Sequence, residues 1–398
     1  MPIFVDRDRL SPRYVPDKLP HREGEIRIVE KFFLDLFPDV EGHYTRIVQL
    51  QGPAGVGKSS VALHVGRLLE EEARRYGINF RHVYLNLRLE STTRFVLYSS
   101  IALKIDPDLR IRNMSAEELL AYLLRYLKAN NIYVVMTVDE VDYYLKCMKS
   151  TDVIYDLTRM GEVFFGEPIN VLGLVFIARD PRWRDMLDPA EQSSLGRIVV
   201  NFKPYTKDQV YDILEYRARE AFAPGAVASE VLDYVAEVTV DHARSDIRFA
   251  LDVLYYAGTL AENEGVERVT LEHVRTVLSQ LEPSITSEDI MTLNGDEKYV
   301  LMAVALELKT SGSAFADLED VWESYREVCE QYGVKPVGRR RFNELLHSLY
   351  SKGIVDAKGL KVGISSVPVE KLSRFLDYVI SRLKEEVQPS NSIGRDYA

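Results

Sequence analysis

The chain has 398 residues, 46% of them hydrophobic, and this length predicts two or three domains with substantial cores. Its 50 Lys and Arg residues are outnumbered by 61 Asp and Glu residues, and the formal charge of -11 excludes a broadly cationic surface for nonspecific polyanion binding. The two cysteines, Cys147 and Cys329, exclude a disulfide framework and a cysteine-based zinc site, and favour a reducing compartment.

No membrane segment or secretion signal is predicted. The longest strongly apolar stretch, residues 169–178, has about half the length that a membrane helix needs. The first residues include Asp6, Arg7, Asp8 and Arg9 in place of an apolar signal core. We therefore expect a cytoplasmic protein with no membrane partner.

The first two hundred residues predict an arm, a helix and an α/β sheet. Several prolines within the first 20 residues indicate an extended arm, and apolar positions between residues 26 and 36 repeat every three or four residues, as in a helix. Short apolar runs predict strands at residues 47–50, 83–87, 132–138, 171–177 and 198–202. Helical patterns separate these runs, which indicates a parallel sheet between helices.

Strand patterns stop after about residue 205, and amphipathic helices at residues 210–214, 231–236 and 247–260 predict a small all-helical unit. Pro283 indicates a boundary near residue 284, because proline cannot continue a helix. The predicted domains are the core with its N-terminal arm at 1–205, the small all-helical unit at 206–284, and a third domain at 285–398.

The third domain is predicted to be a winged helix-turn-helix. Helical patterns occupy residues 299–308, 318–328 and 337–349, and strand-like pieces follow at 354–356 and 361–364. A last helix is expected at residues 369–386, and a disordered tail from residue 389.

A P-loop sequence follows the strand at residues 47–50 and precedes a helix predicted at residues 61–70. The P-loop is formed by Gly52, Pro53, Ala54, Gly55, Val56, Gly57, Lys58 and Ser59, and Ser60 adjoins it in the candidate nucleotide site. The glycines let backbone N–H groups surround phosphates, while Lys58 bridges the β- and γ-phosphates in a catalytic role and Ser59 binds Mg²⁺. The expected cofactors are therefore ATP or ADP and Mg²⁺.

An acidic pair, Asp139 and Glu140, ends the buried strand at residues 132–138. This position is the carboxyl edge of the sheet, where open α/β folds bind ligands. Asp139 is the expected Mg²⁺ partner, and Glu140 the expected base that activates water. For Asp142, a charge at the site and a solvated or helix-capping role all remain open.

Together with these motifs, several segments resemble a family within the AAA+ ATPases, the archaeal replication initiators related to the origin recognition complex and its helicase-loading factor. The resemblance extends from about residue 4 to residue 383, and is carried by segments 10–16, 19–23, 139–142, 187–196 and 204–206. It implies an α/β P-loop AAA+ core with a small all-helical lid, plus a C-terminal winged helix-turn-helix domain.

The resemblance also implies nucleotide contacts outside the P-loop. Tyr14, Val15 and Arg22 of the arm match positions near the adenine, and Tyr205 lies in a further matching segment. Arg248 matches the family's second sensor, which places it on the γ-phosphate from the lid. Such a contact lets lid and core close around ATP and loosen after hydrolysis.

Two departures from the family pattern affect hydrolysis. Arg179 stands where relatives usually carry asparagine as the first sensor, and both contact with the γ-phosphate and pairing with an acid remain open. Ala190 and Glu191 stand where relatives present an arginine, so an arginine finger is not evident. The candidate substitutes are Arg182, Arg184 and Arg197. Slow ATPase turnover is the expectation, since such a finger contributes a large rate factor.

The candidate DNA contacts are Arg339, Arg340, Arg341, Lys358 and Lys361. The three arginines occupy the first turn of the predicted recognition helix, and the two lysines lie in the predicted wing, where they could follow a DNA backbone. An inserted helix within residues 160–170 is a further DNA candidate in the core, although it lacks a dense basic signature.

The leading hypothesis is an ATP-dependent initiator that binds double-stranded origin DNA at the nucleoid, recruits the replicative helicase and acts beside other initiator paralogues. One alternative is a nucleotide-binding paralogue that serves as a protein-docking regulator. It is motivated by the 15 basic and 18 acidic residues of segment 286–398. A motor-type ATPase with robust turnover is the third hypothesis.

Overall fold

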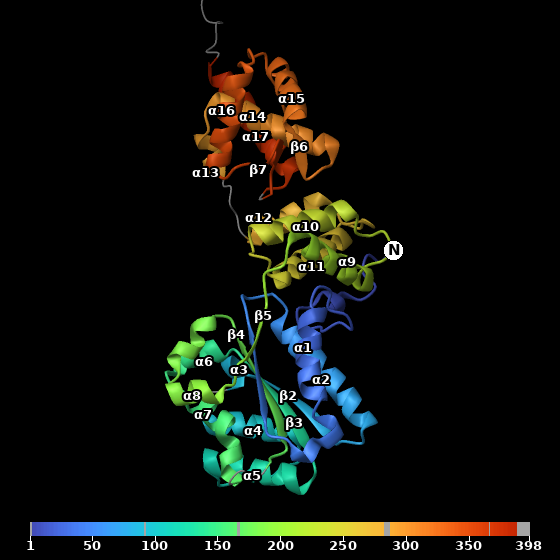
Figure 1. Ribbon diagram of the computed structural model, residues 1–398. Helices are drawn as coiled ribbons and strands as arrows, with labels where there is room; N and C mark the ends of the chain where they lie inside the picture. The colour runs from blue at the N-terminus through green and yellow to red at the C-terminus, as the bar shows by residue number, and fades with distance from the viewer. Residues whose placement is uncertain (1, 91–92, 165–167, 282–286, 366, 388–398) are drawn as a thin grey trace, which may run out of the picture. The chain divides into compact units, whose positions relative to one another are not determined.

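The computed structural model describes residues 2–90, 93–164, 168–281, 287–365 and 367–387 (Figure 1). The chain divides into two compact units. The α/β unit comprises Arg13–Ile213 and Arg244–Arg248, and the helical unit comprises Met1–Pro12, Leu214–Ala243 and Phe249–Ala398.

The α/β unit contains one parallel sheet with the strand order β2-β3-β4-β1-β5. Its strands are β1 (Arg46–Gln51), β2 (Phe80–Asn86), β3 (Tyr133–Asp139), β4 (Val171–Ala178) and β5 (Ile198–Asn201). Every residue of β3 and β4 is buried, as expected for central strands covered on both faces. The predicted parallel sheet is confirmed, but β2 begins three residues before the predicted start, and Leu87 begins a helix. At this sheet edge the exposed Arg81 hides the start of the strand.

Helices cover both faces of this sheet (Figure 1). One face carries α1 (Glu23–Leu34) and α2 (Lys58–Arg75). On the other face lie α3 (Leu87–Glu90), α4 (Arg94–Ile105), α5 (Ala116–Ala129), α6 (Val141–Met148), α7 (Asp152–Arg159) and α8 (Pro189–Ser194). Short 3-10 turns occupy Phe37–Gly42, Met160–Phe164 and Pro181–Met186. Within the segment 160–170, where an inserted helix was expected, Met160–Phe164 form only a 3-10 turn and residues 168–170 are not helical; residues 165–167 lie outside the described residues.

The lid helices are α9 (Lys207–Ala221), α10 (Ser229–Asp241), α11 (Ile247–Asn263) and α12 (Leu271–Leu281). The N-terminal arm, which the sequence grouped with the core, pairs with the end of α9 in the helical unit. Val5 donates its backbone N–H to Ala221 O at 2.8 Å, and the Phe4 ring stacks on Phe222 with centroids 4.7 Å apart. The predicted boundary near residue 284 lies outside the described residues.

The winged-helix domain consists of α13 (Ser287–Thr292), α14 (Gly295–Ser311), β6 (Phe315–Asp317), α15 (Leu318–Gln331), α16 (Arg339–Ser351), β7 (Asp356–Lys358), β8 (Lys361–Gly363) and α17 (Val369–Val387). The sheet order is β6-β8-β7, so a short strand, β6, joins the predicted hairpin. Gly359 makes the two-residue hairpin loop possible, with φ +60°.

One expectation for this domain changes. The strand expected at residues 354–356 begins only at Asp356, because Ile354 is buried and closes the end of α16 by donating to Leu349 O at 3.0 Å. The expected tail from residue 389 lies outside the described residues. Within the described ranges, no helix has both the length and the apolar character that crossing a bilayer requires.

Candidate functional site

The P-loop connects β1 to α2 through a left-handed backbone. Gly57 precedes α2 with φ +87°, and a Cβ atom there would lie 2.9 Å from the Tyr205 hydroxyl. At Gly55, with φ +71°, a Cβ atom would lie 1.9 Å from the Asp246 carboxylate. Glycine is therefore required at both positions by backbone conformation and by space. Ser60 is half-buried in the first turn of α2.

Lys58 is buried and folds back onto the loop. Its Nζ donates to Gly52 O at 2.7 Å and to Pro53 O at 2.6 Å. Burial lowers the pKa of Lys58 to about 8, and the carboxylate of Asp139 opposes this shift. The two carbonyls hold the ammonium at the P-loop. Phosphate oxygens of a bound nucleotide would take their place as acceptors.

Asp139 stands at the end of β3 beside the P-loop. Its Oδ2 accepts from the Ser59 hydroxyl at 2.5 Å and from the Tyr84 hydroxyl at 2.6 Å. A hydroxyl and a carboxylate are ligands that suit Mg²⁺, which is also coordinated by substrate phosphates and water in such sites. Ser59 and Asp139 therefore fit the expected metal.

Tyr84 on β2 is a site residue that sequence reasoning missed. Burial and the neighbouring Asp139 raise its pKa, so the phenol stays a neutral donor to the carboxylate. Tyr84 lies near the carboxyl end of a strand that pairs with β3 in parallel register. The position of Tyr84 near this sheet edge was the signal that could have identified it, because open α/β folds bind ligands at the carboxyl ends of their parallel strands.

Replacing Tyr84 with phenylalanine is expected to weaken Mg²⁺-dependent nucleotide binding several-fold, since Asp139 loses one of its donors. The cost to folding should be about 1 kcal/mol. Mg²⁺ titrations of nucleotide affinity and thermal unfolding measure the two effects. Tyr143→Phe is the matched control, because that ring is part exposed and packs under Arg88. Equal Mg²⁺ dependence in both variants contradicts the assignment.

Glu140 directly follows Asp139 in the sequence and has φ +62°. It forms an ion pair with Arg179 at the end of β4. Burial alone would lower the pKa of Arg179, but the hydrogen bond and charge of Glu140 raise it. The Asp142 carboxylate accepts from the backbone N–H groups of Arg179 and Asp180, both at 3.3 Å. Of the two alternatives for Arg179, the structure shows pairing with an acid, and Asp142 shapes the same turn.

Arg22 lies behind the P-loop. Its Nε donates to Val56 O at 2.9 Å, its Nη2 donates to Lys203 O at 2.8 Å, and its guanidinium stacks over the Tyr205 ring at 3.9 Å. Arg22 and Tyr205 thus support the loop and the segment after β5. Tyr14 and Val15 are half-buried. The carbonyl of Val15 accepts from Arg67 of α2 at 2.8 Å, which fastens the arm to that helix.

Arg248 belongs to a segment that packs on the P-loop. Ile247 donates its backbone N–H to Gly55 O at 3.3 Å, and the preceding Arg244 and Ser245 both adopt positive φ. The Arg248 side chain is 54% exposed, with its Nε 3.7 Å from Asp246 Oδ1. The structure thus brings this segment, the P-loop and the acidic pair together.

The region where relatives present an arginine is a helix N-terminus here. Asp188 accepts from the Glu191 backbone N–H at 2.7 Å, and Glu191 accepts from the Asp188 backbone N–H at 2.9 Å. This capping box explains the acid at this position. Of the suggested substitutes, Arg182 is exposed and paired with Asp180 at 2.9 Å, Arg184 is half-buried, and Arg197 is exposed.

The three arginines of α16 have different surroundings. Arg339 stacks over Trp322 at 5.1 Å and pairs with Glu319 at 2.6 Å, so its guanidinium lies against the domain. The side chains of Arg340 and Arg341 are 95% and 56% exposed and pair with Glu344 of the same helix. Only these two of the three are readily available to a ligand.

The two lysines of the wing also differ. Lys358 pairs with Glu237 of α10 at 2.6 Å. Lys361 is half-exposed, and its Nζ lies 3.7 Å from a carboxylate oxygen of Asp317. Lys358 therefore has a buried acidic partner on the lid, while Lys361 faces an exposed one.

Family models match most of the chain. Residues 41–187 match the AAA domain, residues 211–279 the Cdc6 AAA+ ATPase-type lid domain, and residues 288–366 the CDC6 C-terminal winged helix domain. These matches confirm the predicted fold class.

Three similar proteins cover nearly the whole chain. An ORC1-type DNA replication protein from Pyrococcus furiosus is 32% identical over 96% of this chain and 92% of its own length. The crystal structure of Cdc6p from Pyrobaculum aerophilum is 28% identical with TM-score 0.80, covering 97% of this chain and all of that one. The Aeropyrum pernix ORC1 protein in complex with DNA is 31% identical with TM-score 0.61, covering 96% and 99%.

The resemblance inferred from the sequence motifs is thereby confirmed. A relative of more than 30% identity spans both units, and all three family models fall in the predicted order. The chain belongs to the ORC1/Cdc6 family of AAA+ DNA replication proteins.

Proposed function

We propose that the chain is an ATP-dependent replication initiator that binds double-stranded origin DNA and recruits the replicative helicase, with the ATP or ADP state as a switch. The observation that carries this proposal is that one chain combines a P-loop with its acidic pair and a winged helix with exposed arginines on α16. The solved DNA complex of the related Aeropyrum pernix ORC1 protein supports the DNA part. Other initiator paralogues are proposed partners, in the cytoplasm at the nucleoid.

ATP and Mg²⁺ are the proposed cofactors. Lys58 would bind the β- and γ-phosphates, while Ser59 and Asp139 would hold the metal, which neutralises phosphate charge. Arg22 and Tyr205 would keep the P-loop in place from behind, and the arm at Tyr14 and Val15 would adjoin the base.

The proposed switch depends on Arg248. This residue occupies the first turn of α11, and most of that helix belongs to the lid. Binding of Arg248 to a γ-phosphate would hold this turn at the P-loop, and loss of the phosphate would release it. One continuous helix would therefore pass the nucleotide state from the α/β unit to the lid.

The proposal is tested by fluorescence anisotropy of the full chain with origin-region and scrambled duplexes, across a salt series, with ATP and with ADP. Preference for origin duplex that persists as salt rises supports an initiator, because counterion release makes nonspecific binding salt-labile. Equal, salt-labile binding to both duplexes contradicts it. A difference between ATP and ADP measures the switch.

Replacing Arg340 and Arg341 together with alanine is expected to weaken duplex binding about tenfold or more, and to lower the salt slope by about two, one for each lost phosphate contact. Anisotropy across the salt series measures both quantities. The matched control is Lys371→Ala with Arg374→Ala, two exposed cations on α17. Unchanged binding at low and moderate salt contradicts a DNA role for α16.

A second candidate is a nucleotide-binding regulator that docks on partner proteins. Two specific observations favour it, the inward position of Arg339 and the pairing of Lys358 with an acid. Both contacts reduce the cations available to DNA. Absence of sequence preference in the anisotropy series, together with intact nucleotide binding, would favour this candidate.

A further inference from the structure

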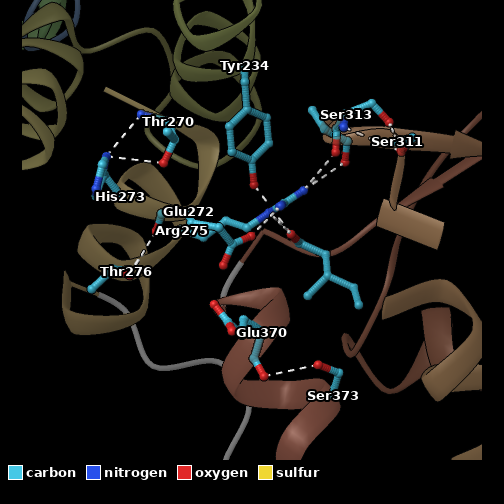
Figure 2. Close-up of polar contacts among 12 residues, drawn as sticks. Tyr234, Thr270, Glu272, His273, Arg275, Thr276, Ser311, Ser313, Glu370 and Ser373 are labelled. Atoms are coloured by element: carbon cyan, nitrogen blue, oxygen red, sulfur yellow. Dashed lines mark hydrogen bonds and ion pairs between the residues drawn. The ribbon is translucent and has the colours of Figure 1, made fainter. Parts of the chain in front are cut away.

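A buried arginine lies between the lid and the winged-helix domain, inside the helical unit (Figure 2). Arg275 of α12 is 2% exposed. Its Nε donates to Ile364 O at 3.0 Å, and its Nη2 donates to Ser313 O at 3.1 Å and Ala314 O at 3.4 Å. All three carbonyls belong to the winged-helix domain, on the segments flanking β6 and β8.

The lid side of the junction holds the guanidinium in place. Arg275 Nη1 pairs with Glu272, one turn earlier on α12, at 2.8 Å. The Tyr234 ring of α10 lies 5.7 Å from the guanidinium carbon, and this ring is buried too. A rigid planar fork with several directed donors fixes orientation as well as distance.

A second contact joins the same two domains. The Glu237 carboxylate of α10 is buried and accepts from Lys358 Nζ of β7 at 2.6 Å. The same ammonium lies 5.7 Å from the Phe315 ring. Separating lid and wing would leave a buried carboxylate without this cation, which is costly.

We propose that Arg275 is a positioning residue that docks the winged-helix domain on the lid, with Lys358 and Glu237 as the second point of attachment. The two domains then move as one body, and the lid sets the orientation of α16. The inference rests on the proposed function, because that orientation matters only if α16 binds DNA. In this proposal Lys358 has a structural role, in place of the DNA contact expected from the sequence.

The test measures the distance between spin labels on the two domains in the full chain. Labels are placed at Tyr256→Cys on the lid and Tyr378→Cys on α17, both half-exposed positions, in a Cys147→Ser background; Cys329 is buried. The expected result is one narrow distance distribution. Arg275→Met should broaden or shift it, since three carbonyls lose their donor. Arg219→Met, an exposed lid arginine paired with Glu215, is the matched control.

A charge exchange separates docking from folding. Glu237→Lys and Lys358→Glu should each broaden the distribution, and the double variant should restore it, which a loss of fold would not do. If Arg275→Met prevents folding, this exchange decides the matter. An unchanged distribution in Arg275→Met, or in both single exchange variants, overturns the proposal.

DNA binding by the same variants separates the two proposals. If the variants broaden the distance distribution and the full chain shows no preference for origin duplex over scrambled duplex, the proposed function fails and the docking role holds. If DNA binding is specific and the distribution does not respond, the docking role fails alone. If both proposals hold, Arg275→Met should bring the ratio of the DNA affinities with ATP and with ADP towards one.

Discussion

Replacing Lys58 with alanine is expected to weaken ATP and ADP binding about 100-fold, which is about 2.8 kcal/mol at 1.4 kcal/mol per tenfold change. The ammonium donates hydrogen bonds to Gly52 O and Pro53 O, so the loop holds this cation in place before a nucleotide enters. Preorganised charge in a buried site gives a stronger phosphate contact than a solvated lysine would. Titration with a fluorescent nucleotide measures the loss.

The control for this prediction is Lys146→Ala, which removes a lysine that is half-exposed and 3.4 Å from Asp180 in the same unit. Its nucleotide affinity should match that of the unchanged chain. Thermal unfolding of both variants reports whether the α/β unit stays folded. Affinity within threefold of normal in folded Lys58→Ala contradicts the assigned phosphate site.

That the P-loop and the acidic pair lie together could be predicted, because each is a local motif. Each β-α turn of a parallel sheet delivers its residues to one edge, so a P-loop after one apolar run and an acidic pair after another must meet. The hydrogen bond from Ser59 to Asp139 joins the two motifs, although the two residues are 80 positions apart in the sequence. The helix predicted at residues 337–349 corresponds to α16, which begins two residues later, at Arg339.

The short strand β6 and the pairing of the N-terminal arm could not be predicted. The three residues of β6 form a strand only because β8 pairs with them, and no pattern of three residues carries a period. The arm pairs with the end of α9 through backbone groups, which any sequence offers. The prolines that indicated an extended arm did not specify where it would pair.

Contacts of single polar side chains with partners far away in the sequence were the features that sequence analysis missed most. Arg275 sits in an amphipathic helix, where an arginine is usually solvated, and its acceptor Ile364 O lies 89 positions away. The Lys358 partner, Glu237, lies 121 positions away. Such pairs depend on how folded domains dock, which neither motif spacing nor periodicity encodes.

Replacing Arg179 with asparagine is expected to raise the ATP hydrolysis rate about tenfold, which is less than the roughly 100- to 10,000-fold that a positioned general base contributes in full. The ion pair with Arg179 engages Glu140, the carboxylate expected to activate water. Asparagine keeps a polar group at the end of β4 without this charge. Steady-state phosphate release at saturating ATP and Mg²⁺ measures the rate.

Arg182→Asn is the matched control, because that arginine is 80% exposed and pairs with Asp180 and not with Glu140. Glu140→Gln should abolish hydrolysis in either background. A lower rate in Arg179→Asn would instead assign Arg179 to the γ-phosphate. Several turnovers per second in the unchanged chain would favour a motor-type ATPase, because a Glu140 held by Arg179 and the capping box at Asp188 both argue for slow hydrolysis.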